Sequence, residues 1–118
     1  MSLFRKKKKN IFIPLAGEEF KLFSSVLKGE IDKLEPKLCL NAKDSTIYSV
    51  AKRYYSTCLF EGISNVLVLS FEPHDRSDML TLIVMIMLAY DNETDVTKKA
   101  TLKKLAEKIQ KAHKGLGE

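Results

Sequence analysis

Residues 79–90 read MLTLIVMIMLAY, and this stretch decides the fold of the chain. Only Thr81 is polar, so the stretch has neither the alternation of a half-buried strand nor the polar face of a surface helix. Its methionine and leucine residues favour a helix, whereas its isoleucine and valine residues favour a strand. The polar stretch 72–78 separates it from the apolar run Val66–Phe71, which favours a hairpin of two strands. We therefore predict a strand from Leu80 to Tyr90.

Two segments in the first half of the chain carry apolar residues three and four positions apart, which is the spacing of an amphipathic helix. The first begins at Glu18, whose charge favours a helix N-terminus, and is stopped by Pro36. The second is predicted to be capped by Asp44 or Ser45 and to end by Gly62. Its buried stripe is predicted to consist of Ile47, Val50, Ala51, Tyr54 and Cys58.

A third amphipathic helix is predicted near the C-terminus, with Thr94 as its cap and Gly115 close to its end. Its apolar stripe is Leu102, Leu105, Ala106, Ile109 and Ala112. Its other face is rich in lysine.

Three more strands are predicted from short apolar runs. Residues 10–15 contain Pro14 and are expected to form a short edge strand. Residues 37–41 are too short for a helix. Residues 66–71 are apolar at positions on both faces, which is typical of a strand that is buried on both sides.

The predicted fold class is α+β: a small mixed β-sheet with three amphipathic helices on its faces. The alternative is a mostly α fold in which residues 79–90 form a buried central helix. With 118 residues, one globular domain is expected over residues 11–118. Residues 1–10 are set apart as a basic tail, with a charge run typical of disordered segments.

Composition excludes several classes of protein. Apolar residues make up 45% and charged residues 30%, as in an ordinary globular protein. The apolar stretch 79–90 is shorter than the roughly 18 residues of a membrane span, and residues 11–16 are too short for a signal-peptide core. Cys39 and Cys58 are both interpreted as reduced core residues. These features predict a cytoplasmic location.

The strongest candidate for catalysis or metal binding is the stretch Glu72–Asp78, which combines His74 with three carboxylates. Its spacing matches no metal motif, so we expect a solvated loop. His113 has no partner histidine at helical spacing, Cys58 lies on an apolar stripe, and the five glycines form no phosphate-binding loop. The sequence therefore predicts no enzyme activity, no cofactor, no metal and no small-molecule substrate.

Positive charge gathers towards both ends of a chain whose net charge is +5. Such clusters bind polyanions by neutralising phosphates, although lysines on a solvated helix face also serve solubility. The candidate polyanion-binding residues are Arg5, Lys6, Lys7, Lys8, Lys9, Lys103, Lys104, Lys108, Lys111 and Lys114.

A second candidate surface lies on the predicted last strand, where Ile83, Met85 and Met87 share one face. Methionine adapts its shape to a partner, so these residues are candidates for an interface. The sequence thus favours a small non-catalytic protein-binding or regulatory domain that self-associates, as a homodimer. The alternative is binding of nucleic acid or of an anionic membrane surface through the basic tail and the C-terminal lysines.

Overall fold

Helices dominate the computed structural model, which describes residues 10–37, 39–61 and 65–116. Within these ranges the elements in chain order are β1 (Ile11–Ala16), α1 (Glu18–Leu34), α2 (Ala42–Glu61), β2 (Val66–Phe71), a short 3-10 helix η1 (Pro73–Asp75), α3 (Arg76–Asn92) and α4 (Val96–Leu116). The predicted mixture of α and β structure is confirmed in this coarse form. The described part of the chain holds a two-stranded antiparallel sheet and four α-helices, in place of the predicted larger sheet with three helices.

Residues 79–90 belong to α3, so the predicted strand is wrong and the alternative of a helix is correct. The reason begins in the polar stretch before it. The side chain of Asp75 accepts a hydrogen bond from the Glu72 backbone N–H at 2.8 Å, and Pro73 opens the turn. This reciprocal cap with a proline in the first turn starts a helix, so the stretch does not close a hairpin.

Packing explains why a helix without a polar face is stable here. Helix α3 lies against α1, α2 and α4, so its inner side is covered by apolar side chains of these helices. Its buried residues are Met79, Leu82, Ile83, Met85 and Ile86.

Strands β1 and β2 confirm the predicted strands at residues 10–15 and 66–71, and they pair with Ile11 opposite Phe71 and Ala16 opposite Val66. The N–H of Gly17 donates to the carbonyl of Asn65 at 3.0 Å, immediately beyond the paired residues. Since hydrogen-bonded pairs alternate in an antiparallel ladder, the odd-numbered residues of β1 bond to β2. Pro14 therefore lies at a position whose backbone nitrogen faces away from β2, so its lack of an N–H removes no hydrogen bond from the ladder.

Strand β2 is buried on one face only, so the prediction of burial on both faces is wrong. Leu67, Leu69 and Phe71 point into the core, whereas Val66 and Val68 are exposed. In the described part of the chain the helices cover only one face of the two-stranded sheet, so the side chains on its other face lie in solvent.

The predicted strand at residues 37–41 is absent at the described residues 37 and 39–41, and residue 38 lies outside the described part. Instead Asn41 caps α2, because its side-chain oxygen accepts the backbone N–H of Asp44 at 2.7 Å. The helix thus starts before the predicted caps Asp44 and Ser45.

Helix α4 is capped by Asp95, one residue after the predicted Thr94. The carboxylate of Asp95 accepts the backbone N–H of Lys98 at 3.0 Å.

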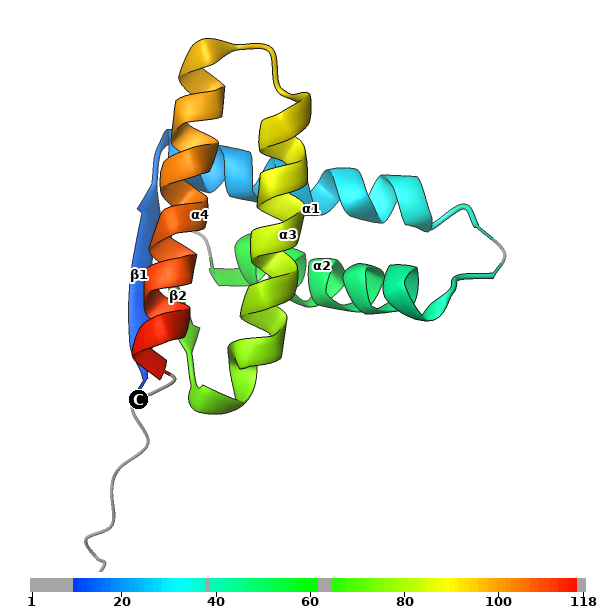
Figure 1. Cartoon of the computed structure of the whole chain (residues 1–118), viewed down its shortest axis with the longest axis horizontal. Helices are drawn as coiled ribbons and strands as arrows, with labels where there is room; N and C mark the ends of the chain where they lie inside the picture. The colour runs from blue at the N-terminus through cyan, green and yellow to red at the C-terminus, as the bar shows by residue number, and fades with distance from the viewer. Residues whose placement is uncertain (1–9, 38, 62–64, 117–118) are drawn as a thin grey trace, which may run out of the picture.

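Figure 1 shows the four helices as two antiparallel hairpins that cross, α1 with α2 and α3 with α4, with the sheet beside α4. The apolar stripes predicted for α2 and α4 are buried where the layers meet. Among the described helices, none combines the length and apolar character that crossing a membrane requires.

Candidate functional site

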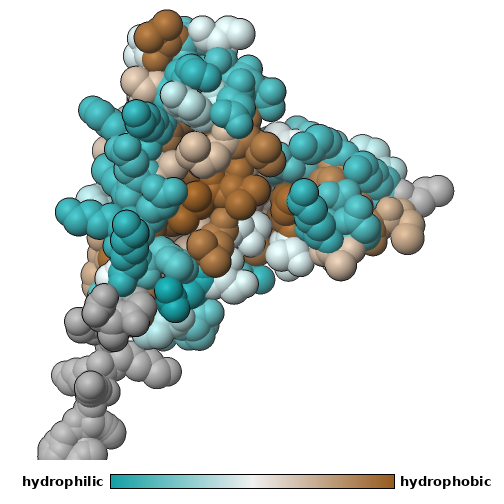
Figure 2. All heavy atoms as spheres, viewed as in Figure 1, coloured by the Kyte–Doolittle hydropathy of each residue, from teal (hydrophilic) through white to brown (hydrophobic). Residues whose placement is uncertain are grey.

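The outer side of α3 exposes large apolar side chains. Leu80, Val84, Met87 and Leu88 are 51%, 46%, 37% and 45% exposed, and we call these four residues the α3 stripe. Their spacing of three and four residues aligns them along one side of the helix. In the orientation of Figure 1, the hydrophobic surface in the middle of Figure 2 lies over α3. Large apolar side chains that lie together on one exposed side of a helix are a common feature of protein-binding surfaces.

The three predicted interface residues are separated by the helix. On a strand, Ile83, Met85 and Met87 share one face, but each residue of a helix is rotated by about 100° from the previous one. Ile83 and Met85 are therefore buried in the core, and only Met87 is exposed. Leu80, Val84 and Leu88 were missed, and they become visible only when the segment is read with the helical period.

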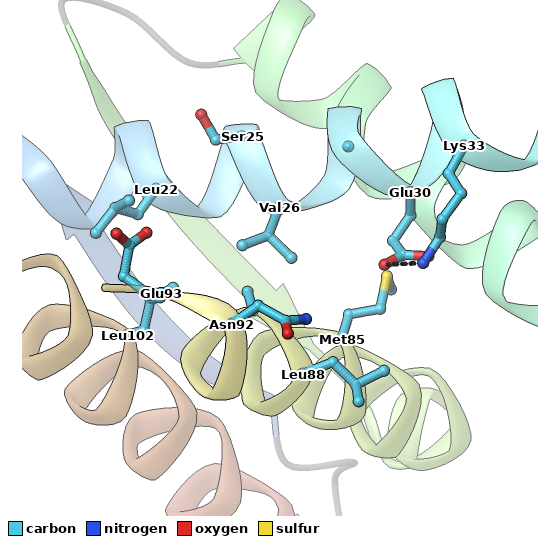
Figure 3. A pocket seen from close by; sticks show the side chains of 12 residues that line it. Leu22, Ser25, Val26, Glu30, Lys33, Met85, Leu88, Asn92, Glu93 and Leu102 are labelled. Atoms are coloured by element: carbon cyan, nitrogen blue, oxygen red, sulfur yellow. Dashed lines mark hydrogen bonds and ion pairs between the residues drawn. The ribbon is translucent and has the colours of Figure 1, made fainter. Parts of the chain in front are cut away.

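A groove of about 450 Å³ runs along one side of the α3 stripe, between α1 and α3. Figure 3 shows Val26 of α1 opposite Met85 and Leu88 of α3 across this groove. At one end the Lys33 ammonium lies 3.3 Å from a carboxylate oxygen of Glu30. Both walls of the groove thus carry apolar side chains, interspersed with the polar side chains of Ser25 and Asn92, and charged residues lie at its rim.

A smaller hollow of about 260 Å³ borders the stripe on the other side, between α3 and α4. Its lining includes Leu80 and Ile83 of α3 with Gln110, His113 and Lys114 of α4. His113 thus lies beside an apolar residue of the α3 stripe.

The carboxylates of the stretch Glu72–Asp78 have structural partners. Glu72 and Asp75 form the cap of η1, and Asp78 of α3 accepts hydrogen bonds from Arg53 and, at 3.3 Å, from the Tyr54 hydroxyl of α2. Burial, followed by the negative charge of Asp78, raises the pKa of Tyr54. This network joins α2 to α3.

His74 is exposed and lies 3.4 Å from Asp75 and 3.7 Å from Glu72, measured from ring nitrogen to carboxylate oxygen. No set of three or more His, Cys, Asp or Glu side chains in the described part of the chain converges on a point where a metal ion would bind.

The two cysteines lie in different environments. Cys58 is buried, and burial raises the pKa of its thiol while a hydrogen bond with Ser24 opposes that shift. A buried thiol with a raised pKa is a poor nucleophile. Cys39 is exposed, so its predicted place in the core is wrong, because the segment before α2 is not a strand.

The lysines of α4 form an exposed row that we call the lysine face: Lys103, Lys104, Lys108, Lys111 and Lys114. Among the described residues only Lys108 of this face makes an ion pair, with Glu19 of α1 at 2.6 Å. Lys108 and Lys111 border a groove of about 480 Å³ between β1 and α4. The predicted residues Arg5 to Lys9 lie outside the described part of the chain.

Comparison with known proteins identifies no relative: no family model, no curated protein and no solved structure matches this chain.

Proposed function

We propose that this chain is a non-catalytic protein-binding module and that the α3 stripe is its docking surface. The observation that carries the proposal is the exposure of four large apolar side chains in register on one helix. Scattered exposed apolar residues are normal on a protein surface, but an aligned row beside a groove is typical of helix recognition.

The surroundings of the stripe support the same proposal. The α1–α3 groove on one side and the hollow beside α4 on the other give the surface relief, and polar side chains such as Glu30 and Gln110 border these two depressions. A centre of apolar side chains with a polar rim is the usual composition of a protein interface.

Site-specific photo-cross-linking in cells of the source organism tests the proposal. Val84 is replaced by a benzophenone-bearing amino acid, and Lys104, exposed on α4, carries the same group in a matched control. We expect discrete protein adducts from position 84 that are absent from position 104.

Purified components then test whether the adduct reports specific binding. An identified partner is expected to bind the unmodified chain and to lose affinity for the Leu88→Lys variant, while circular dichroism shows an unchanged fold. Absence of any adduct specific to position 84 contradicts the proposal.

The lysine face supports a second candidate function, binding of nucleic acid or of an anionic surface. Four of its five lysines make no ion pair among the described residues, which leaves their charge available to phosphates. Lysine gives electrostatic attraction without the bidentate geometry that reads bases, and Arg53 is already paired with Asp78.

Titration of a labelled single-stranded oligonucleotide at several salt concentrations tests this second function. Affinity is expected to fall steeply as salt rises, and Lys103→Gln with Lys104→Gln is expected to flatten the slope. Anionic lipid vesicles in a parallel titration separate a membrane surface from nucleic acid. No binding of either probe at low salt contradicts the second function.

A further inference from the structure

We propose that the α3 stripe binds the α3 stripe of a second copy of this chain, with the two helices antiparallel about a two-fold axis beside Val84. The inference rests on the proposed function, because it names the partner of the same surface. Two properties of α3 favour a second copy as the occupant: its exposed positions other than Met87 are symmetric about Val84, and the exposed charges beside the two ends of the stripe have opposite signs.

The symmetry is visible in the positions that α3 exposes. Leu80 and Leu88 lie four residues before and after Val84, and Ser77 and Asp91 lie seven residues before and after it. A two-fold axis at Val84 places residues that precede it against residues that follow it in the other copy. Leu80 then faces Met87 and Leu88 of the second copy, and the two Val84 side chains meet at the axis.

The polar group nearest the centre of this contact is satisfied within its own helix. Thr81 is half-buried beside the stripe, and its hydroxyl donates to the carbonyl of Ser77 at 3.2 Å. An interface over this part of α3 therefore buries no unpaired hydroxyl donor, which otherwise weakens association.

Charge selects the antiparallel arrangement. Exposed Arg76 lies at the N-terminal end of the stripe, where Lys114 of α4 borders the same hollow as Leu80. The carboxylates of Asp75 and Asp78 at this end are less exposed, and they are engaged by the Glu72 backbone N–H and by Arg53. Exposed Asp91 lies at the C-terminal end, where Glu93 borders the same groove as Leu88. Antiparallel helices place the basic end of each copy against the acidic end of the other and oppose the two helix dipoles. Parallel helices place like charges together.

Four side chains are a small interface, since a stable one buries about 800 Å² on each partner. The α1–α3 groove and the hollow beside α4 extend the contact, because Leu88 lines the first and Leu80 the second. We expect a weak, concentration-dependent dimer.

Disulfide cross-linking of the full chain tests the geometry. Exposed Cys39 is first replaced by serine, while buried Cys58 remains. With Val84→Cys we expect a linked dimer after mild oxidation, because the two residues meet at the axis. With Leu80→Cys alone we expect little linkage, because the two Cα atoms are separated by about 12 Å along the helices, beyond the roughly 7 Å limit for a disulfide. Lys104→Cys is the matched exposed control on α4.

A charge exchange tests the direction of the helices by an independent measurement. Asp91→Arg is expected to weaken the dimer about fivefold in sedimentation equilibrium, since at each of the two symmetric ends an attraction to Arg76 is replaced by a contact between like charges. Adding Arg76→Asp to the same chain is expected to restore most of the affinity, because the pair is present again with its signs exchanged.

Equal linkage at positions 80 and 84 overturns the antiparallel geometry. A chain that stays monomeric at every concentration and does not link at position 84 overturns the dimer. If photo-cross-linking from position 84 then still gives an adduct with another protein, the protein-binding proposal stands without the dimer, and if it gives none, both fail.

Discussion

Truncating two leucines of α3 to alanine tests the most consequential feature of the fold, which is the helical state of residues 79–90. Leu82 is 0% exposed and Leu80 is 51% exposed, although the two residues are only two positions apart. On a helix they are rotated by about 200°, whereas on a strand they share one face. The helix therefore predicts very different losses of stability from the same chemical change.

The magnitudes follow from burial. Leu82→Ala removes apolar contacts and leaves a cavity among the helices, so we expect a loss of about 2–5 kcal/mol in the free energy of unfolding. Leu80→Ala removes a side chain that is already half in water, which costs about 1 kcal/mol or less, because no closed cavity forms.

Urea unfolding followed by circular dichroism measures both losses. For a denaturant slope of about 2 kcal/mol per molar urea, a loss of 3 kcal/mol moves the midpoint by about 1.5 M. The measurement is made at low protein concentration, so that dissociation of a dimer does not add to the loss. Ile86→Val, at a residue that is also 0% exposed, is a milder substitution with an expected loss of about 1 kcal/mol. Equal losses for Leu80→Ala and Leu82→Ala would refute the helix.

Three further predictions concern other parts of the chain. Gly17 has a φ of 59° and a ψ of −123°, a region that L-residues rarely adopt, so Gly17→Ala is expected to cost about 1–3 kcal/mol in urea unfolding; an unchanged midpoint contradicts this. Burial, followed by the negative charge of Asp78, raises the pKa of the Tyr54 hydroxyl above its ordinary value of 10.0. Above that pH the unfolded chain loses the hydroxyl proton while the folded chain keeps it, so Tyr54 should lower the free energy of unfolding by about 1.4 kcal/mol per pH unit. Tyr54→Phe is expected to remove that part of the alkaline slope, and an identical slope in the variant argues against it. Exposed Cys39 is expected to react rapidly with a thiol reagent, whereas buried Cys58 is expected to react only on unfolding. Peptide mass spectrometry measures the two rates, and equal rates would contradict the burial of Cys58.

Part of the candidate site is accessible to sequence reasoning. The lysine face is recognisable because the apolar stripe of α4 has the helical period and the lysines fall opposite it. Of the three candidate interface residues, Met87 is exposed, whereas Ile83 and Met85 are buried. The three residues share one face only with the period of a strand, which this segment does not adopt.

Local sequence determined α1, α2, α4 and the two strands. Each of these helices has a polar side as well as an apolar one, so its period is encoded within about four turns of chain and needs no information from elsewhere. The structure places the caps of α2 and α4 one to four residues from the predicted ones, because Asn41 and Asp95 compete with neighbouring residues that cap helices equally well.

Tertiary structure alone decided the state of residues 79–90 and the surface that they present. A segment that is apolar on all sides can be buried either as a strand or as a helix, so its own sequence does not decide between them. Here α1, α2 and α4 cover the side of a helix that carries Leu82, Met85 and Ile86. Which side stays open depends on where those three helices lie. That arrangement comes from the packing of apolar residues far apart in the chain, such as Phe23, Leu82 and Leu105, into one core. The α3 stripe is the part of the segment that these helices leave in solvent.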